Sequence, residues 1–287
     1  MEAWGTFVHE TRHSSLVVTV NRGNMKKRLC LSAIGFALMC HQAVAQDAFA
    51  FFRGDVFPPA RSTPAAWLLE LHKADGLLDS NIAVATFLPN TKLAWHNHPG
   101  GQILLITDGV GYYQEKGKQK QIVRVGDVIK CLPGVEHWHG ASTETGVTYM
   151  ATSPAQKGGT IWAQAVTDAE YGSPASNSRA APAVGNTDSA AAVELLKADA
   201  IFPFHMTSET FAPDKKQDWH KDRGGQILVI TKGTGYYQEK GKPKQVVRKG
   251  DVIKCAAGIE HWHGASAENG VTYIAIRPAA EGGAGST

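Results

Sequence analysis

Histidines are spaced along this chain in a way that suggests metal chemistry. Seven of the nine histidines from residue 46 onward fall in two short motifs, each of which occurs twice. In the first copy His96 and His98 stand one residue apart, and His137 and His139 repeat that spacing. Side chains alternate between the two faces of a β-strand, so both members of each pair would project to the same side. Imidazole binds manganese, iron, nickel, copper or zinc. The spacing therefore predicts a divalent cation held by histidines from two strands.

The second copy of the motifs departs from the first at one position. It contains His220, His261 and His263, but Asp222 stands where the spacing places the second histidine. Aspartate is a competent oxygen ligand, although it is shorter than histidine. The neighbouring Arg223 can form an ion pair with Asp222 or oppose a cation. The residues leave open whether this copy binds a metal. If it does, the carboxylate lowers the net charge of the centre and makes it the poorer Lewis acid.

These motifs belong to a longer repeat with a shift of 124 residues, whose register holds without insertion from Leu71 to Ala151 and from Leu195 to Ala275. His96–Gly140 and His220–Gly264 are identical at 33 of 45 positions. Two copies are too few and too long for a solenoid, so each copy is expected to be a domain. A stretch rich in Ala, Ser, Pro and Gly separates the copies and reads as a linker. The predicted units are domain 1 at residues 46–171, the linker at 172–192 and domain 2 at 193–287.

Within each copy, short β-prone runs alternate with turn residues. In the first copy the predicted strands are Gln102–Thr107, Ile122–Arg124, Val128–Cys131 and Val147–Thr152. The predicted turns are Asp108–Gly109, Lys116–Lys118, Gly126–Asp127 and Pro133–Gly134. Runs of this length with frequent turns are typical of an antiparallel sandwich or barrel, and no long amphipathic helix is visible. The predicted fold class is all-β.

The first 45 residues carry an export signal. Three basic residues follow Met25, an apolar run extends from Leu29 to Cys40, and small residues form a cleavage site that ends at Ala45. The apolar run is shorter than the roughly 20 residues needed to span a bilayer. We therefore expect a signal peptide and a secreted or periplasmic protein, with residues 1–24 upstream of the natural start.

The rest of the chain is electrically neutral. From residue 46 on there are 24 basic and 24 acidic side chains, with no basic stripe. This balance argues against a nucleic acid or an anionic membrane as a partner. Cys131 and Cys255 occupy equivalent points of the two copies, too far apart for a disulfide, so we expect two buried free thiols.

The histidine motifs resemble those of a known family. The spacing from His96 and His98 to Gln102 and then Gly109 is similar to the first motif of the cupin superfamily, and His137 stands in the second motif. The resemblance covers both copies. It implies two tandem cupin barrels, each a double-stranded β-helix or jelly roll, and hence a bicupin.

The chain departs from the cupin pattern at two places in each copy. Cupins commonly have Glu as a ligand where this chain has Gln. With an amide in place of a carboxylate, the ligands leave the full charge on the cation, which suits Lewis-acid chemistry. Cupins also favour Gly six residues before the first His, where Asn90 and Asp214 stand. Both residue types tolerate a left-handed backbone, so we expect the turn to be kept.

A narrower resemblance concerns the phrases AWHNHPGGQ and GVEHWHGA and the tail from Trp162 to Tyr171. They look like the small manganese-dependent cupin hydroxynitrile lyases, and also like quercetinase-like cupins. The lyase resemblance implies cleavage of an α-hydroxynitrile at a divalent metal, with manganese preferred over iron, zinc, nickel or copper. The metal ligands that it implies in domain 1 are His96, His98, Gln102 and His137. In domain 2 the equivalent set is His220, Asp222, Gln226 and His261.

The resemblance also implies an active-site role for His139. With a pKa in the neutral range, this side chain would serve as general acid or base, or else orient His137 or a water molecule. Two other functions remain open: a quercetinase-like dioxygenase, and a non-catalytic cupin that binds a metal or a small ligand. The partners that we expect are a small-molecule substrate, the pairing of the two barrels within the chain and possible homo-oligomers.

Overall fold

The computed structural model describes residues 55–58, 61–62, 66–177 and 191–279. The predicted signal peptide and the residues upstream of it lie outside the described residues, as does most of the predicted linker. Within the described ranges, no helix is long and apolar enough to cross a membrane.

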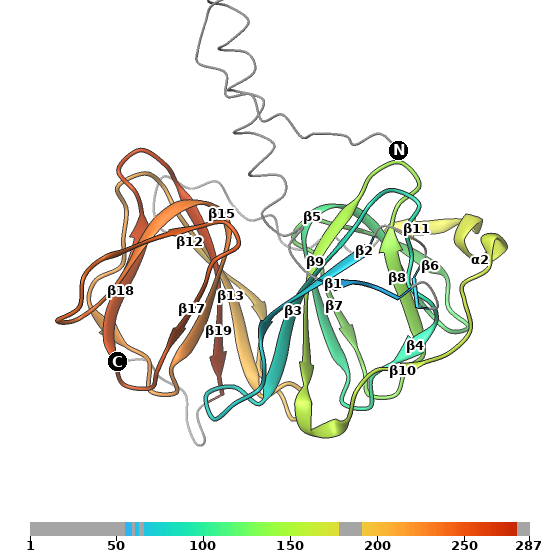
Figure 1. The fold of residues 1–287 in the computed structure, drawn as a ribbon, viewed down its shortest axis with the longest axis horizontal. Helices are drawn as coiled ribbons and strands as arrows, with labels where there is room; N and C mark the ends of the chain where they lie inside the picture. Colours follow the sequence, from blue (N-terminus) through green and yellow to red (C-terminus); the bar gives the residue numbers. More distant parts are fainter. Residues whose placement is uncertain (1–54, 59–60, 63–65, 178–190, 280–287) are drawn as a thin grey trace, which may run out of the picture. The chain divides into compact units, whose positions relative to one another are not determined.

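The described strands form two curled sheets, one for each copy of the repeat, in which every pair but one is antiparallel (Figure 1). The strands of the first sheet are β1 (Asp55–Val56), β2 (Ala66–His72), β3 (Ser80–Phe87), β4 (His96–Asn97), β5 (Gln102–Glu115), β6 (Lys120–Arg124), β7 (Val128–Cys131), β8 (His137–Ala141), β9 (Val147–Pro154), β10 (Ile161–Trp162) and β11 (Ala175–Asn177). Those of the second sheet are β12 (Ala191–Leu196), β13 (Phe204–Phe211), β14 (His220–Lys221), β15 (Gln226–Glu239), β16 (Gln245–Arg248), β17 (Val252–Cys255), β18 (Glu260–Ala265) and β19 (Val271–Pro278). The all-β fold predicted from the sequence is confirmed.

Strand β5 carries the chain from one half of the first sheet to the other. Its first residues pair with β7 and β9, and its last residues pair with β6 and β8. The prediction of a turn at Asp108–Gly109 was wrong, because the strand continues through a bulge between Ile106 and Asp108. A bulge inserts one residue and bends its strand, so these turn-type residues curl the sheet. Gly109 has φ 72°, and a Cβ there would overlap the carbonyl oxygen of Gly146.

The turns before the histidine motifs keep their left-handed backbone without glycine. Asn90 has φ 65° and Asp214 has φ 63°, and these are the positive φ angles of non-glycine residues among those described. The expectation that Asn and Asp would preserve these turns is confirmed. The backbone N–H of Asn90 donates to the carbonyl of Ser142, and Asp214 does the same to Ser266.

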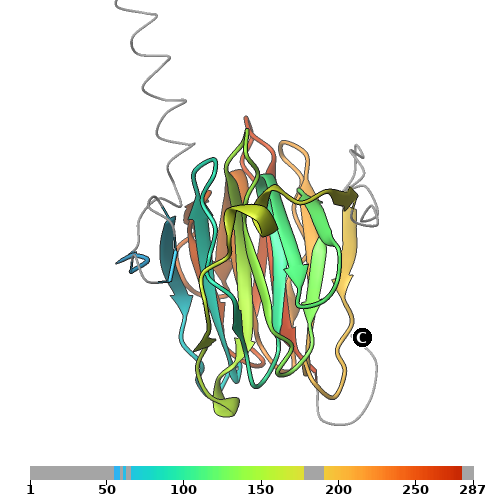
Figure 2. The same ribbon diagram turned by 90° about the vertical axis from the view of Figure 1, so that its right-hand side faces the viewer.

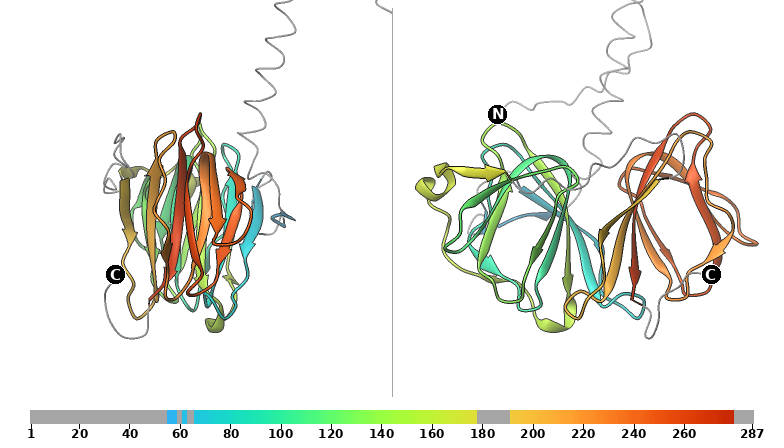
Figure 3. Two further views of the ribbon diagram at one scale, coloured as in Figure 1. Left: turned by 90° about the vertical axis from the view of Figure 1, so that its left-hand side faces the viewer. Right: turned by 180° about the vertical axis from the view of Figure 1, so that it is seen from behind.

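The tail of the first copy packs on the outside of its own sheet. Helix α2 (Asp168–Gly172) lies on the outer side of the first sheet (Figure 2). It begins with a capping box, in which Thr167 and Glu170 exchange hydrogen bonds. Strand β11 then pairs in parallel with β6. The prediction that residues 172–192 are a linker throughout was therefore wrong at both ends, because Ala175–Asn177 extends the first sheet and the second sheet begins at Ala191. The second copy has no helix in the part of the chain that the structure describes (Figure 3).

The two copies share an apolar core. One cluster of buried side chains combines residues of both sheets, among them Ile82 and Ile103 from the first and Phe204 and Ile227 from the second. Two ion pairs flank it, and they are equivalent under the repeat: Lys130 to Asp199, and Lys254 to Asp75. Because the two ion pairs join equivalent residues of opposite copies, the two barrels pair within the chain about a pseudo-twofold axis, as the sequence predicts. Cys131 and Cys255 are free and buried, also as predicted.

The ion pair at Asp199 predicts a pH effect on stability. Hydrogen bonds from Lys130 and from the backbone of Phe202 lower the pKa of Asp199 from 3.8 to about 2. The folded state therefore gains stability above pH 3.8, and this gain is lost as the pH falls from 3.8 towards 2. Both side chains are about one third exposed, so the gain is below about 1 kcal/mol. Urea unfolding of the wild type and of Asp199→Asn should show a difference at pH 5 that vanishes near pH 2. A difference independent of pH would contradict this account.

Candidate metal centre

The two histidine pairs of the first copy meet inside the first barrel. Strands β4 and β8 run antiparallel with His96 directly opposite His137, and their ring centroids are 4.5 Å apart. His139 lies two residues further along β8, on the same face, with its ring 5.0 Å from that of His96. One ring nitrogen of each of the three lies within 4.8 Å of the others. The strand register thus places three imidazoles around one point.

The other two predicted groups lie beside these rings. His98 follows β4, with its ring 5.3 Å from that of His96 and 5.6 Å from that of His137. The chain then turns tightly, because the backbone N–H of Gly101 donates to the carbonyl of His98 at 2.9 Å. This turn brings Gln102, the first residue of β5, to the same cavity as His96 and His98. All four residues implied as ligands by the resemblance are therefore gathered at one place.

Hydrogen bonds leave the ligand atoms of this group free. Nδ1 of His96 lies 2.8 Å from the carbonyl of Ala94, and Nδ1 of His137 lies 2.9 Å from that of Val135. A carbonyl only accepts, so each Nδ1 carries the proton and each Nε2 keeps a lone pair. The buried polar atoms without a partner here are His98 Nε2, Gln102 Oε1, His137 Nε2 and His139 Nε2. Such atoms are costly to leave unsatisfied, and a divalent cation would satisfy those of His98, Gln102 and His137. The donor set therefore fits a metal ion.

The electrostatics of the site keep its imidazoles neutral. Burial, with the nearby His137, lowers the pKa of His96 well below its usual value, and the same causes lower the pKa of His98 to about 4. Burial also lowers the pKa of His137. Metal binding requires neutral imidazole, so these rings are ready to bind a cation at neutral pH.

His139 has a partner of its own. The hydroxyl of Tyr149, on β9, lies 2.6 Å from Nδ1 of His139, and both side chains are buried. Burial and the three neighbouring histidines lower the pKa of His139 well below its usual value. The expectation of a pKa in the neutral range was therefore wrong, because the sequence does not reveal how deeply this ring is buried among like groups. His139 is neutral at pH 7 and can accept a proton.

A cavity of 470 Å³ opens onto these groups. His96, His98, Gln102 and His139 are among the residues that line it. Much of the remaining wall is apolar or small, and it includes Ile82, Ala83, Ala85, Leu93, Ala151 and Trp162. Trp162 belongs to the tail of the first copy, where β10 pairs with β4. The site thus combines polar groups that fit a cation with a wall that suits an apolar substrate group.

Comparison with known proteins places the chain in a family. Residues 83–152 and 207–277 match the family model of the cupin domain. Over 115 residues the chain is 36% identical to the (R)-mandelonitrile lyase of Granulicella tundricola. The match covers 38% of this chain and 88% of that protein. The chain belongs to the cupin superfamily. Because the cupin domain occurs twice, it is a bicupin.

Solved bicupin-like structures agree with this fold. The salicylate 1,2-dioxygenase of Pseudoaminobacter salicylatoxidans has a TM-score of 0.59 and 12% identity, covering 83% of this chain and 80% of that chain. The vicilin of Corylus avellana has a TM-score of 0.58 and 13% identity, covering 79% of this chain and 84% of that chain. At these identities the likeness shows the fold alone.

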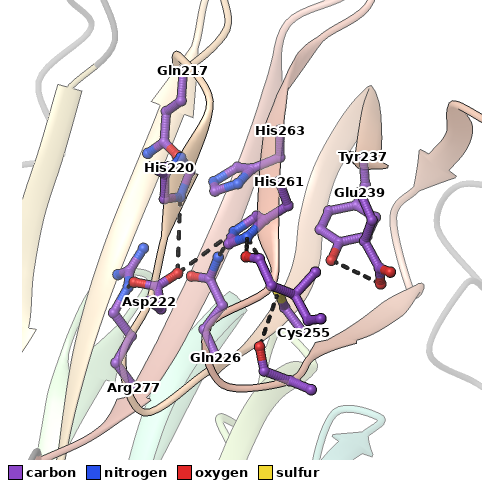
Figure 4. Close-up of polar contacts among 12 residues, drawn as sticks. Gln217, His220, Asp222, Gln226, Tyr237, Glu239, Cys255, His261, His263 and Arg277 are labelled. Carbon is purple, nitrogen blue, oxygen red and sulfur yellow. Dashed lines mark hydrogen bonds and ion pairs between the residues drawn. The ribbon is translucent and has the colours of Figure 1, made fainter. Parts of the chain in front are cut away.

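The second cupin domain gathers the equivalent residues in a different arrangement. His220 stands opposite His261, with ring centroids 4.3 Å apart. Oδ2 of Asp222 lies 3.8 Å from Nε2 of His220 and 3.5 Å from Nε2 of His261 (Figure 4). The partner of Asp222 is Arg277, on β19, at 3.1 Å. The sequence drew attention to Arg223, but an arginine 55 residues away forms the pair.

Besides Arg277, two residues of these sites were missed by sequence reasoning. Tyr149 bonds His139, but both copies have Tyr at this position, so a comparison of the two copies does not single it out. Glu209 bonds His263 at 2.8 Å, and it replaces Ala85 of the first copy. A comparison of the two copies could have found Glu209, because it shows a carboxylate in place of a small residue on a buried strand.

Proposed function

We propose that the first cupin domain is a metal-dependent lyase that cleaves an α-hydroxynitrile to a carbonyl compound and hydrogen cyanide. Its ligands are His96, His98, Gln102 and His137, and manganese is the cation. The observation that carries this proposal is the unpartnered Nε2 of His139, which lies beside the ligand atoms in the wall of the cavity. The (R)-mandelonitrile lyase relative supports the same reaction class.

The chain's own residues provide the electrostatics of the reaction. A divalent cation held by this ligand set would act as a Lewis acid towards the substrate hydroxyl. His96, His98 and His137 are neutral, and Gln102 is an amide, so no ligand offsets the charge of the cation. A site of this kind favours an oxygen that develops negative charge.

His139 acts first as the general base and then as the general acid. In this proposal Nε2 of His139 accepts the proton of the substrate hydroxyl, while its Nδ1–H donates to the hydroxyl oxygen of Tyr149. The oxygen's electron pair forms the new carbonyl, the carbon–carbon bond breaks, and its electron pair leaves with cyanide. His139 then returns the proton to cyanide, which departs as hydrogen cyanide. Atoms and charges balance without an oxidant or reductant.

The cavity suits a small substrate with an apolar group. Ala83, Ala85 and Leu93 form part of the wall beside the histidines, and Trp162 adds an aromatic face. A volume of 470 Å³ lies within the range of small-molecule sites, about 300–1,000 Å³. We therefore expect an aryl or branched hydroxynitrile to bind with its hydroxyl towards the histidines.

An assay with mandelonitrile tests this proposal. The manganese-loaded chain should release cyanide and benzaldehyde faster than a metal-free preparation. Equal rates in the two preparations would contradict it. If the loaded protein instead consumes oxygen when a flavonol is added, the quercetinase-like dioxygenase takes the place of the lyase.

We also propose that the protein is exported. The support is the sequence of residues 25–45, with its basic start, its apolar run and its small-residue end. Expression of the full chain in a bacterium should give a periplasmic product, and N-terminal sequencing of that product should begin at Gln46. A cytoplasmic product that retains the apolar run would contradict export.

A further inference from the structure

The tail of the first copy, residues 161–177, covers an aromatic surface on the outside of the first barrel. Two hydrogen bonds of 2.8 and 3.0 Å join the backbone of Trp95 to the tail. Val166 and Tyr171 of the tail then pack against Trp95 and Trp138 in a buried cluster. Under this cover Trp95 is only 2% exposed.

Two lysines of the first barrel also hold the tail. The ammonium of Lys92 lies 3.6 Å from the carboxylate of Asp168 and 4.4 Å from the ring centre of Tyr171. The ammonium of Lys120 donates to the backbone carbonyl of Tyr171 and lies 4.3 Å from the ring centre of Tyr112. Both lysines are buried. The surface thus recognises its segment by aromatic packing and by two cations.

The second barrel repeats this surface without a described segment upon it. Three aromatic residues and two lysines stand at the equivalent positions and are here called the open aromatic face: Trp219, Tyr236, Trp262, Lys216 and Lys244. Lys216 lies 4.8 Å from the ring centre of Trp262, and Lys244 lies 3.9 Å from that of Tyr236. Both lysines are exposed, and Trp219 is 43% exposed. Among the described residues, none forms a backbone–backbone hydrogen bond with Trp219.

Two strand edges beside this face are open as well. In the first sheet β10 pairs with the edge of β4, and β11 pairs with the edge of β6. The equivalent strands β14 and β16 each have a single partner in the part of the chain that the structure describes. His96 on β4 is buried beneath Trp162, with ring centroids 4.9 Å apart, whereas His220 on β14 is only half-buried. An open edge can add a strand through its backbone groups.

The charge of this region selects the kind of segment that fits. Four lysines on or beside the open aromatic face are exposed: Lys215, Lys216, Lys221 and Lys244. Two such faces would repel each other, which disfavours a dimer formed through them. The tail that covers the first barrel has the opposite character, because residues 161–177 contain two acidic residues and no basic one. A complementary segment is therefore acidic.

We propose that the open aromatic face binds an extended, acidic and aromatic segment of a partner protein. The segment adds a strand antiparallel to β14, as β10 does to β4, and places an aromatic ring beside Trp219 and a carboxylate near Lys216. Residues 178–190 and 280–287 of the chain contain no aromatic residue, so they do not have the side chains that this face accepts. The interaction lies on the outside of the second barrel and is independent of the proposed lyase reaction.

A peptide with the sequence of residues 160–177 is the probe that tests this proposal. Isothermal titration calorimetry with the full chain should show one peptide bound per chain, because the tethered tail already occupies the first barrel at high effective concentration. Trp219→Ala and Lys216→Glu should each weaken binding at least about 10-fold. Lys73→Glu makes the same charge change at an exposed lysine of the first copy, and it should leave binding unchanged.

A second peptide keeps the test independent of how the variants fold. With Asp168→Lys and Glu170→Lys, the peptide should bind the wild type at least about 10-fold more weakly, because like charges then meet. No saturable binding of the original peptide, or binding that all of these changes leave equal, would overturn the proposal.

Two other occupants of the face would also overturn the proposal. If the peptide binds only after Phe49→Ser and Phe51→Ser, the chain's own residues 46–54 cover the face. If light scattering shows a dimer that Trp219→Ala converts to a monomer, the face belongs to a second copy of the chain. None of these measurements depends on lyase activity, so a chain without that activity can still bind the peptide.

Discussion

Replacement of His139 by alanine should lower kcat for cleavage of mandelonitrile by about 10²- to 10⁴-fold, while manganese stays bound. His139 Nε2 has no partner in the structure, and the proposed role of this ring is to move a proton. The loss should therefore appear in kcat with the metal content unchanged. Steady-state kinetics and elemental analysis of the same preparation measure both quantities.

The matched control is the equivalent histidine of the second barrel. His263 bonds Glu209 in the second barrel, away from the proposed active site, so His263→Ala should leave kcat within about twofold of the wild type. If His139→Ala retains full turnover, His139 is not the acid or base. If the wild type does not turn over mandelonitrile and His139→Ala still binds the metal, the protein is a non-catalytic cupin that binds a metal or a small ligand.

Replacement of His137 by alanine should remove both the metal of the first barrel and the lyase activity. His137 is fully buried, and its Nε2 has no partner other than the predicted cation. A bound cation contributes several kcal/mol to stabilising charge in a transition state, so kcat/KM should fall by at least about 10³-fold. The metal count should fall by one ion per chain, and added manganese should not restore activity at concentrations that saturate the wild type.

A second histidine variant separates this effect from general damage to the fold. His205 lies on β13, away from the gathered histidines, and its ring nitrogen faces the backbone of Ala198 at 3.5 Å. His205→Ala should keep the metal count and the activity of the wild type. Equal losses in His205→Ala and His137→Ala would mean that both changes act on folding, and the ligand role of His137 would then be without support.

Most of the fold could be predicted from the sequence, because the repeat and the alternation of strands are local patterns. The duplication predicted two barrels, and the short β-prone runs predicted the strands of the all-β fold. The turn predicted at Asp108–Gly109 failed because bulges and turns use the same residue types, and only strand pairing tells them apart. Strand β11 was missed for a similar reason, since a polar segment pairs with β6 through its backbone.

The candidate metal residues of the first barrel could be named from motif spacing, but their surroundings could not. The partner of His139 comes from a different strand, and the low pKa of His139 depends on burial that no local pattern encodes. In the second barrel, the contacts of Arg277 join residues that are 55 to 70 positions apart. Interactions of this range depend on how the strands are brought together, and a motif search does not reveal them.

A crystal structure of the manganese-loaded protein, with anomalous scattering measured at the manganese edge, tests the central claim most directly. The account predicts a peak in the first barrel, about 2.0–2.3 Å from the ligand atoms of His96, His98, Gln102 and His137, with His139 nearby but not coordinated. The structure also brings nitrogens of His96, His137 and His139 within 4.8 Å of one another, so a different ligand set is a real alternative. A peak coordinated by His139 in place of His98, or no peak in the first barrel, would contradict the account.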